Sequence, residues 1–326
     1  IPNTKGKIPI RKLVDVNVML ASNLASLVRP YTAMNPSPSS PQGLTPPPGH
    51  YQSVFRPGLF SSRTVWVTGG GSGIGRCTAH ELASLGARVV ISGRTAEKLN
   101  RVAQEIREDG GQCETIAFDI RDEEAVKAAV AAMVARLGPI HGLVNNAGGQ
   151  FPAPLQAISK RGFEAVVSSN LTGGFLMMRE VFLQSMQEHG GSVVNMTADF
   201  RNGMPGMGHS GAARSGMSNL TMSAAFEWAQ AGVRVNAVAP GWVASSGMDS
   251  YGGAVKAMIP RLREHVPLRR LATEAEISAA IVFLLSPGAA FITGVTLQID
   301  GAASLGSPVF PTMEHESSEA FEGFHR

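Results

Sequence analysis

The sequence predicts an α/β fold in which helices cover both faces of one doubly wound parallel sheet. From residue 61 onward, short apolar runs of strand length alternate with segments of helical periodicity, and this alternation implies parallel strands joined by right-handed crossovers. The first of these strands, Thr64–Val67, precedes the glycine-rich run 68–75 and a helical segment that begins at Arg76. A strand, a glycine turn and a helix in this order form the anion-binding unit of nucleotide-binding folds.

The remaining elements continue the same alternation. We expect six further strands, at residues 87–92, 113–118, 142–146, 192–197, 233–238 and 295–299. We expect helices at residues 95–108, 123–137, 159–187 and 210–229, and a loop with helices over residues 242–286. Seven parallel strands in a single sheet fit this pattern, and no repeat of solenoid or propeller length is present in the sequence.

Composition divides the chain into three parts. Residues 1–60 are basic, and residues 30–48 within them are rich in proline and serine, which predicts an extension that is partly disordered. Residues 61–304 are expected to form the nucleotide-binding domain, in which residues 242–268 cover an apolar substrate as a lid. The methionine and leucine side chains of that segment suit such a role, although they are as often plain core. Residues 305–326 form a C-terminal tail.

Charge and cysteine content narrow the function classes. Residues 1–60 hold six of the 28 Lys and Arg residues and one of the 25 Asp and Glu residues, so the rest of the chain has a net charge of −2. This balance argues against nucleic-acid binding. No apolar run reaches the roughly 18 residues of a membrane span. Two cysteines are too few for a disulfide framework or a zinc site, so we expect no metal and a bacterial cytoplasmic location.

The glycine-rich run is expected to bind the phosphates of a dinucleotide. One glycine lets the chain turn sharply, one removes the Cβ that would block the pyrophosphate, and one lets the helix pack close to the strand. A glycine run alone also fits an ordinary tight turn. The candidate residues of this run are Thr68, Gly69, Gly71, Ser72, Gly73, Ile74 and Gly75.

The spacing of these glycines is similar to that of a known family. The pattern G-x-x-x-G-x-G at residues 69–75, with a threonine before it, resembles the short-chain dehydrogenase/reductase family. The run Asn145-Asn146-Ala147-Gly148 after the fourth strand matches a second element of that family. The resemblance covers about residues 62–304. It implies a single Rossmann-type domain that binds a nicotinamide cofactor.

The corner after the second strand indicates which nicotinamide cofactor is preferred. The ribose-binding position lies about 20 residues beyond the glycine run, and here the chain has Ser92-Gly93-Arg94 with no acid. The Arg94 guanidinium suits a 2′-phosphate, and Lys98 adds positive charge one helical turn later. We therefore expect NADP(H) in preference to NAD(H). The alternative is that Arg94 is a solvated surface base.

Three further segments are assigned to the cofactor by the resemblance. Asp119 and Ile120, after the third strand, match the position beside the adenine ring, although Asp119 could instead cap the next helix. The run after the fourth strand matches the floor of the cofactor site, through Asn146, Ala147 and Gly148. The segment after the sixth strand matches the part that contacts the nicotinamide carboxamide, through Pro240, Gly241, Val243 and Ser245.

The catalytic residues usual in this family are largely replaced. The resemblance implies a serine, a Tyr-x-x-x-Lys pair and an asparagine. The asparagine is present as Asn170, whose implied role is to bend its helix and hold a water molecule. The serine position is alanine, with Thr197 beside it, and the Tyr-x-x-x-Lys pair aligns with Ser210 and Arg214. Arg214 can still donate to the nicotinamide ribose, but a ketone reduction has lost its usual proton donor.

The replaced segment, residues 209–214, resembles the trans-2-enoyl-CoA reductases, with the 2,4-dienoyl-CoA reductases as near relatives. In such enzymes charge develops on an enolate oxygen, which preorganised donors can stabilise. We expect backbone N–H groups around residues 148–151 and the Ser210 side chain to bind this oxygen, with His209 as a second candidate. His209 or water would protonate the α-carbon, but His209 could equally be a core residue.

The sequence is also compatible with other functions. The resemblance to bacterial relatives also suggests an alcohol or aldehyde dehydrogenase of the citronellol/citronellal type. A 3-oxoacyl reductase is disfavoured by the missing tyrosine. In a different class, the chain could be a catalytically silent NADP-binding subunit. The expected partner is a small acyl thioester or terpenoid, and the resemblance implies a homodimer or homotetramer.

Overall fold

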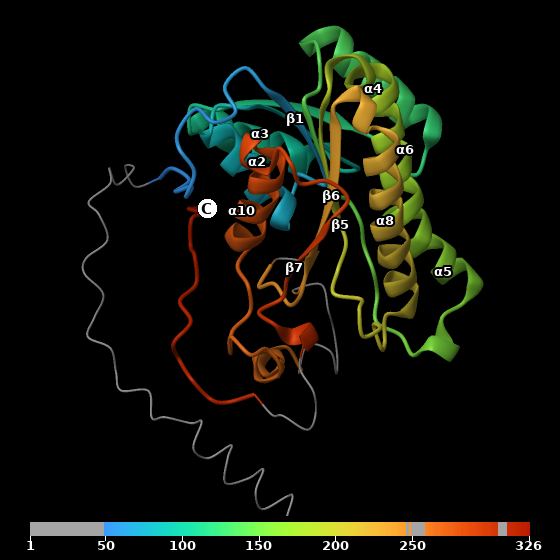
Figure 1. Ribbon diagram of the computed structural model, residues 1–326, viewed down its shortest axis with the longest axis vertical. Coiled ribbons are helices and arrows are strands. Elements are labelled where there is room, and N and C mark those ends of the chain that lie inside the picture. The colour runs from blue at the N-terminus through green and yellow to red at the C-terminus, as the bar shows by residue number, and fades with distance from the viewer. Residues whose placement is uncertain (1–48, 246–247, 249–257, 306–311) are drawn as a thin grey trace, which may run out of the picture. The chain divides into compact units, whose positions relative to one another are not determined.

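One seven-stranded parallel sheet forms the centre of the molecule (Figure 1). This computed structural model describes residues 49–245, 248, 258–305 and 312–326. The strand order is β3-β2-β1-β4-β5-β6-β7, which confirms the predicted doubly wound α/β fold. The strands are β1 Thr64–Thr68, β2 Arg88–Gly93, β3 Gln112–Ala117, β4 Gly142–Asn145, β5 Gly191–Met196, β6 Val233–Pro240 and β7 Thr296–Ile299. Every predicted strand is present, with bounds that differ by at most two residues.

The direction in which the chain adds strands reverses between β1 and β4. From β1 the chain builds outward to β3, and from β4 it builds the other way to β7. Since the helices that follow these strands leave toward opposite sides, a crevice opens beyond the carboxyl ends of the strands at such a switch point. Ligand binding is therefore expected at the ends of β1 and β4.

Helices cover both faces of the sheet (Figure 1). On one face lie α2 Gly73–Ser84, α3 Ala96–Glu108 and α10 Glu274–Leu285, and on the other lie α4 Glu123–Leu137, α6 Gly173–Val181 and α8 Gly208–Glu227. Successive residues of a strand point to opposite faces. Accordingly, Val65 and Val67 join the core of the first face, and Trp66 joins the core of the second.

The helix predicted for residues 159–187 is one helical run that contains two π-helical segments. It consists of α5 Lys160–Val167, η2 Ser168–Thr172, α6, η3 Phe182–Met186 and α7 Gln187–His189. Ser159 caps its start by accepting a hydrogen bond from Gly162 N. The first π-helical segment holds Asn170. Single π-helical turns inside α-helices are common at functional sites.

A chain of buried amides ties the middle of the sheet to α8. Asn145 Nδ2 donates to Asn195 Oδ1 at 2.9 Å, and Asn195 Nδ2 donates to Thr221 Oγ1 at 2.9 Å. All three residues are buried. Since buried amides are costly to leave unpaired, this chain fixes the relative positions of β4, β5 and α8.

The segments before β1 and at the C-terminal end both pack against the first face. Tyr51 and Phe60 are only 5% and 4% exposed, although an extension was expected as far as residue 60. Gln52 N donates to Gly323 O at 2.9 Å, so the two segments also contact each other. The packed domain therefore includes residues 51–60. Residues 1–48 of the expected extension lie outside the described residues.

The predicted lid is described only in part. Residues 246–247 and 249–257 lie outside the described residues, and Ile259–His265 forms the 3-10 helix η6. Where the chain is described, none of its helices combines the length and apolar character needed to cross a membrane.

Candidate functional site

A pocket of about 830 Å³ lies beyond the carboxyl ends of β1, β2, β4, β5 and β6. It occupies the crevice expected at the switch point of the sheet. Most of the residues predicted for the cofactor line it: Gly69, Gly71, Ser72, Gly73, Ile74, Arg94, Lys98, Asp119, Ile120, Asn146, Ala147, Gly148, Arg214, Pro240, Gly241, Val243 and Ser245. The fold thus brings together segments that are far apart in the sequence.

Thr68 and Gly75, also predicted to contact the cofactor, lie behind the pocket wall. Thr68 Oγ1 accepts hydrogen bonds from Asn146 N at 3.0 Å and Ala147 N at 2.9 Å. In return, Asn146 Nδ2 donates to Thr68 O at 3.0 Å. These bonds join the ends of β1 and β4, so Thr68 shapes the site without lining it.

Gly75 allows the start of α2 to approach the glycine turn closely. A Cβ at this position would lie 2.4 Å from both Asn146 Nδ2 and Gly69 O. Gly69 itself has φ of +68°, a conformation that residues with a side chain rarely adopt. The turn therefore places backbone N–H groups at the N-terminus of α2 beside the pocket, as binding of phosphate requires. This cradle fits the dinucleotide that the sequence predicts.

Charged side chains line the part of the pocket that follows β2 and β3. Arg94 and Lys98 are both there, as the prediction of a 2′-phosphate requires. Asp119 is held by Arg121, whose Nε and Nη2 donate to its carboxylate over 2.5–3.0 Å. These hydrogen bonds keep the pKa of Asp119 below its ordinary value. Asp119 is not the helix cap, because Asp122 caps α4.

Asn170 holds the loop that follows β4. Its Oδ1 accepts a hydrogen bond from Gly149 N at 2.9 Å, and its Nδ2 donates to Gly149 O at 2.8 Å. The Asn170 side chain is buried and does not line the pocket. The Gly149 N–H, one of the backbone donors that we expected at the substrate oxygen, is therefore already engaged.

Thr197 lines the pocket, but its hydroxyl is engaged with the backbone. Thr197 Oγ1 donates to Val238 O at 2.8 Å, and Thr197 N donates to the same oxygen at 2.8 Å. This geometry ties the end of β5 to β6. In this conformation the Thr197 hydroxyl cannot take the role of the family's serine, which is to orient the substrate oxygen. Thr197 is therefore a structural residue of the site.

Ser210, at the position of the family's tyrosine, does not line the pocket itself but contacts a side chain that does. Its Oγ donates to Gln150 Oε1 at 2.6 Å. Ser210 is completely buried, whereas Gln150 lines the pocket. The pair therefore joins the N-terminal turn of α8 to the loop after β4, and it places a carboxamide at the pocket surface.

His209 lies behind the same loop. Its Nδ1 accepts a hydrogen bond from Ser210 N at 2.9 Å, so its hydrogen is on Nε2, which is buried without a partner among the described residues. Its ring packs edge-on against Phe151 with centroids 4.5 Å apart. His209 is fully buried and does not line the pocket. This environment agrees with the core alternative rather than with proton donation to a substrate.

Arg214, at the position of the family's lysine, lines the pocket and is anchored from behind. Its Nη1 donates to Met196 O at 2.6 Å, and its Nε is buried without a partner among the described residues. Burial lowers the pKa of Arg214 to about 10, so the guanidinium is still charged at neutral pH. A buried donor beside an open pocket suits a ligand with acceptor oxygens, such as ribose hydroxyls.

Several pocket residues had not been assigned from the sequence. The Gln150 side chain and Arg121 each depend on a partner, Ser210 or Asp119, that only the fold brings near. Asp199 also lines the pocket, and burial followed by the charge of Asp300 raises its pKa. The loop between β5 and α8 contributes Gly203, Met204, Pro205 and Met207. The one local feature of the sequence that could have pointed to these residues as part of the pocket is the run of Gly, Pro and Met in that loop.

Comparisons with known proteins agree with this site. A family profile described as "Enoyl-(Acyl carrier protein) reductase" matches residues 69–304. The chain is 34% identical over 261 residues to the peroxisomal 2,4-dienoyl-CoA reductase of Danio rerio. This alignment covers 79% of this chain and 86% of that protein. It is 35% identical over 246 residues to a probable 2,4-dienoyl-CoA reductase of Bacillus subtilis, with 74% and 96% covered.

Solved structures show the same fold. A citronellol catabolism dehydrogenase of Pseudomonas aeruginosa PAO1 is 64% identical and superposes with a TM-score of 0.71, covering 78% of this chain and all of that one. The profile match, the sequence relatives and this structure agree with the nucleotide-binding turn and the pocket described above. The chain therefore belongs to the short-chain dehydrogenase/reductase family and is an oxidoreductase that uses a nicotinamide cofactor.

Proposed function

We propose that the protein reduces the conjugated C=C bond of a 2-enoyl thioester with NADPH. The observation that carries this proposal is the buried Ser210 at the tyrosine position, whose hydroxyl donates to Gln150 rather than to the pocket. Two relatives named 2,4-dienoyl-CoA reductases support it. The expectation that His209 donates a proton is not carried forward, because its ring is sealed from the pocket.

The chemistry of the two bond types differs in what the protein must supply. A reduced nicotinamide, when bound, supplies a hydride. Carbonyl reduction then creates an alkoxide, which needs a nearby acid of suitable pKa. Reduction of a conjugated C=C bond creates an enolate, which fixed donors can stabilise until the carbon takes up a proton. Among the described residues no tyrosine lines the pocket, since Tyr51 packs against α2; Tyr31 and Tyr251 lie outside them.

Two side chains of this chain are suited to stabilising an enolate. Because Gln150 Oε1 accepts from Ser210, donation from the Gln150 carboxamide falls to its Nε2. Arg214 supplies a permanent positive charge to the same pocket, held in place by its bond to Met196 O. Water reaching the open pocket is the proposed source of the proton at the α-carbon. The apolar side chains Met204 and Met207 would then face the acyl chain.

A dehydrogenase of the citronellol type is the second candidate. One observation favours it specifically, the 64% identity to the citronellol catabolism dehydrogenase of Pseudomonas aeruginosa. This identity is higher than that to either dienoyl-CoA reductase. Carbonyl chemistry at this site would need another acid near the substrate oxygen. Asp199 is the described carboxyl of the pocket with a raised pKa.

The preference for NADPH can be tested at Arg94. R94A is expected to raise the KM for NADPH about 10- to 100-fold, because a charge-assisted contact with the 2′-phosphate is lost, and to leave the KM for NADH nearly unchanged. R101A is the matched control, since Arg101 is an exposed arginine of α3, the helix that begins two residues after Arg94, and it does not line the 830 Å³ pocket. Equal effects of R94A on both cofactors would contradict the proposal.

The substrate class can be tested by following the loss of NADPH absorbance. Crotonyl-CoA, a longer 2-enoyl-CoA and a 2,4-dienoyl-CoA are offered separately, with citronellal as the carbonyl substrate. The proposal predicts oxidation of NADPH with the thioesters. Oxidation with citronellal alone would favour the second candidate. Binding of NADPH without oxidation of it by any of these compounds would contradict both and favour a silent subunit.

We further propose a cytoplasmic homo-oligomer. Both cysteines, Cys77 and Cys113, are buried and unpaired, which suits a reducing compartment. Large apolar side chains near α8 and β7 are exposed, among them Phe226 at 87% and Phe291 fully, as expected of a surface that another copy covers. Light scattering of the purified protein tests this proposal, and a monomer at micromolar concentration would contradict it.

A further inference from the structure

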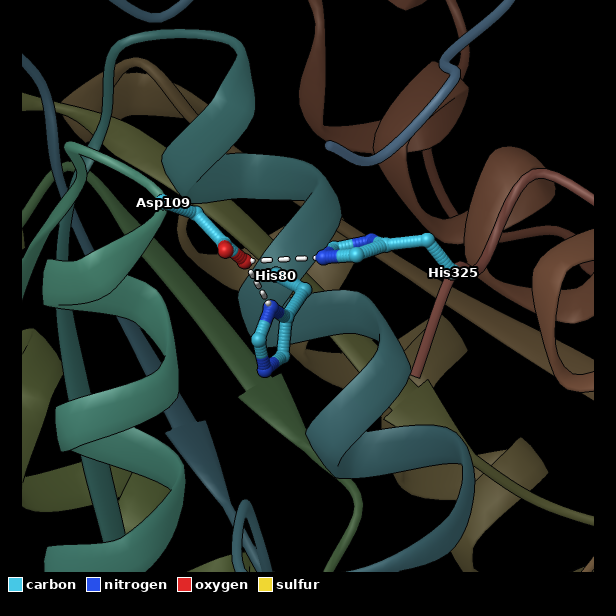
Figure 2. A group of neighbouring side chains, drawn as sticks. All are labelled: His80, Asp109 and His325. Atoms are coloured by element: carbon cyan, nitrogen blue, oxygen red, sulfur yellow. Dashed lines mark hydrogen bonds and ion pairs between the residues drawn. The ribbon is translucent and has the colours of Figure 1, made fainter. Parts of the chain in front are cut away.

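Three side chains from distant parts of the sequence meet on the face of the sheet covered by α2 and α3. His80 lies on α2, Asp109 follows the last residue of α3, and His325 lies in the C-terminal segment. Figure 2 shows both rings directed toward the same carboxylate. Asp109 Oδ2 is 3.4 Å from His80 Nδ1 and 3.0 Å from His325 Nε2, and the three atoms lie within 4.8 Å of one another.

The tautomer of His80 that carries its hydrogen on Nε2 leaves a lone pair directed at this carboxylate. His80 Nε2 lies 3.3 Å from Glu105 Oε2. A neutral imidazole carries a single hydrogen, so a hydrogen on Nε2 serves Glu105 and leaves Nδ1 without one. The lone pair of Nδ1 then faces Asp109 Oδ2, an unfavourable contact between two acceptors. A cation between these atoms would make the contact favourable.

His325 completes the group in the same way. Its Nδ1 is buried without a partner among the described residues, while its Nε2 points to Asp109. In the tautomer of His325 that carries its hydrogen on Nδ1, this Nε2 has a lone pair, which accepts from Arg326 Nε at 3.3 Å. A metal ion at the centre of the group would replace Arg326 Nε as the partner of this lone pair.

The spacing and the surroundings match a zinc site. A tetrahedral zinc ion with bonds of about 2.0–2.2 Å holds nitrogen and oxygen ligand atoms about 3.3–3.5 Å apart. The two separations from Asp109 Oδ2, 3.4 Å and 3.0 Å, are close to this value, and the two imidazole nitrogens lie within 4.8 Å of each other. Glu105 behind His80 supplies the carboxylate that commonly orients a metal-binding imidazole. Asp109 Oδ1 accepts from Arg326 Nη2 at 2.6 Å, which leaves Oδ2 directed at the centre.

The charges around the group balance before any ion is added. The carboxylates of Glu105, Glu108 and Asp109 face the guanidiniums of Arg76, Arg101 and Arg326. Phe324 shields the group from water on one side, with its ring centroid 5.2 Å from that of His80.

We propose that His80, Asp109 and His325 bind a divalent transition metal of the zinc class. Two imidazoles with one carboxylate suit zinc, whereas magnesium and calcium prefer oxygen ligands throughout. None of the three residues lines the cofactor pocket. The metal therefore joins α2, α3 and the C-terminal segment, and its role is structural. No metal was expected from the sequence, because two cysteines are too few for a zinc site of the cysteine type.

The test uses untagged full-length protein that has been freed of metal with a chelator and dialysed. Titration with zinc chloride in a calorimeter is expected to show one ion bound per chain, and zinc is expected to raise the temperature of thermal unfolding. H325Q is expected to weaken zinc binding at least tenfold and to remove the thermal shift. E105Q, which changes only the carboxylate behind His80, is expected to weaken binding about 10- to 100-fold.

H315Q is the matched control, because His315 lies in the same C-terminal segment but contacts Pro267 O instead of the group. It is expected to bind zinc as the wild type does. D109N provides a second ligand variant should H325Q fail to fold, and NADPH binding reports folding in each case. Absence of zinc binding by the wild type, or equal binding by wild type, H325Q and D109N, would overturn the proposal.

Discussion

Gln150 is the residue on which the proposed chemistry most depends. Its carboxamide lines the pocket and accepts a hydrogen bond from the buried Ser210. The sequence alone aligned Ser210 and Arg214 with the family's tyrosine and lysine, because motif spacing fixes such positions. It could not predict that Ser210 would act on Gln150, because that contact joins residues that are 60 apart in the chain.

Q150L is expected to lower kcat for a 2-enoyl-CoA by about 10²–10³, the effect of losing one preorganised donor, while KM for NADPH changes little. T197V is the matched control at the pocket wall. It should keep kcat near the wild-type value and reduce the free energy of unfolding by about 0.5–1.5 kcal/mol, since the partner of the hydroxyl among the described residues is Val238 O. Steady-state kinetics measures kcat and KM of the two variants, and urea unfolding measures their free energy of unfolding. A T197V enzyme as impaired as Q150L would return Thr197 to the catalytic residues.

At the scale of elements, the glycine turn and α2 form the part of the site that was predicted most fully. A strand, a glycine turn and a helix in this order leave few arrangements of the backbone, so the sequence predicted the turn residue by residue. The sequence could not predict which residues of the turn line the pocket and which support its wall. Thr68 and Gly75 support the wall from behind because of contacts with Asn146, which comes from β4.

G75A is expected to abolish measurable NADPH binding. The added Cβ would lie 2.4 Å from Gly69 O, so the turn and the start of α2 would have to separate. G149A is the matched control, because a Cβ there meets nothing within 4 Å. Fluorescence titration with NADPH measures both variants. Near-normal binding by G75A would contradict the close packing described here.

The family resemblance implied that Asn170 bends its helix, but the periodicity of the sequence could not predict that the bend is a π-helical turn. Helical periodicity over residues 159–187 predicted one helix, and the extra residue of a π-helical turn leaves almost no mark on such a pattern. The consequence for the site is direct. The turn directs the Asn170 side chain at both backbone atoms of Gly149, and so it fixes the loop that carries Gln150.

At the scale of the whole molecule, the segment before β1 joins the domain at Glu81, and the C-terminal segment packs Phe321 and Phe324 against the cluster of Tyr51, Cys77 and Ala275. Glu81 is fully buried on α2 and accepts hydrogen bonds from Tyr51, Ser53 and Ser278. Composition predicted an extension and a tail, because neither segment has helical or strand periodicity. Their packing depends on single aromatic and polar side chains, which leave no periodic pattern in a sequence.

E81Q is expected to change how stability depends on pH. Burial raises the pKa of Glu81. A carboxyl with a raised folded-state pKa contributes its full stability below its unfolded pKa of about 4.3, and that contribution is lost as pH rises through the folded-state pKa. A glutamine does not titrate. The free energy of unfolding of E81Q minus that of the wild type should therefore increase from about pH 4 to pH 8, as urea unfolding can measure. A difference that is constant with pH would contradict a raised pKa.

The proposed reaction delivers hydride to a carbon conjugated with a thioester rather than to a carbonyl carbon. Its most direct test offers the enzyme crotonyl-CoA and citronellal together, with NADPH that carries deuterium at the transferred position, and locates the deuterium by NMR and mass spectrometry. We expect a saturated acyl-CoA with deuterium on its β-carbon and no deuterated alcohol. Citronellol with deuterium on its alcohol carbon, beside unchanged crotonyl-CoA, would contradict it.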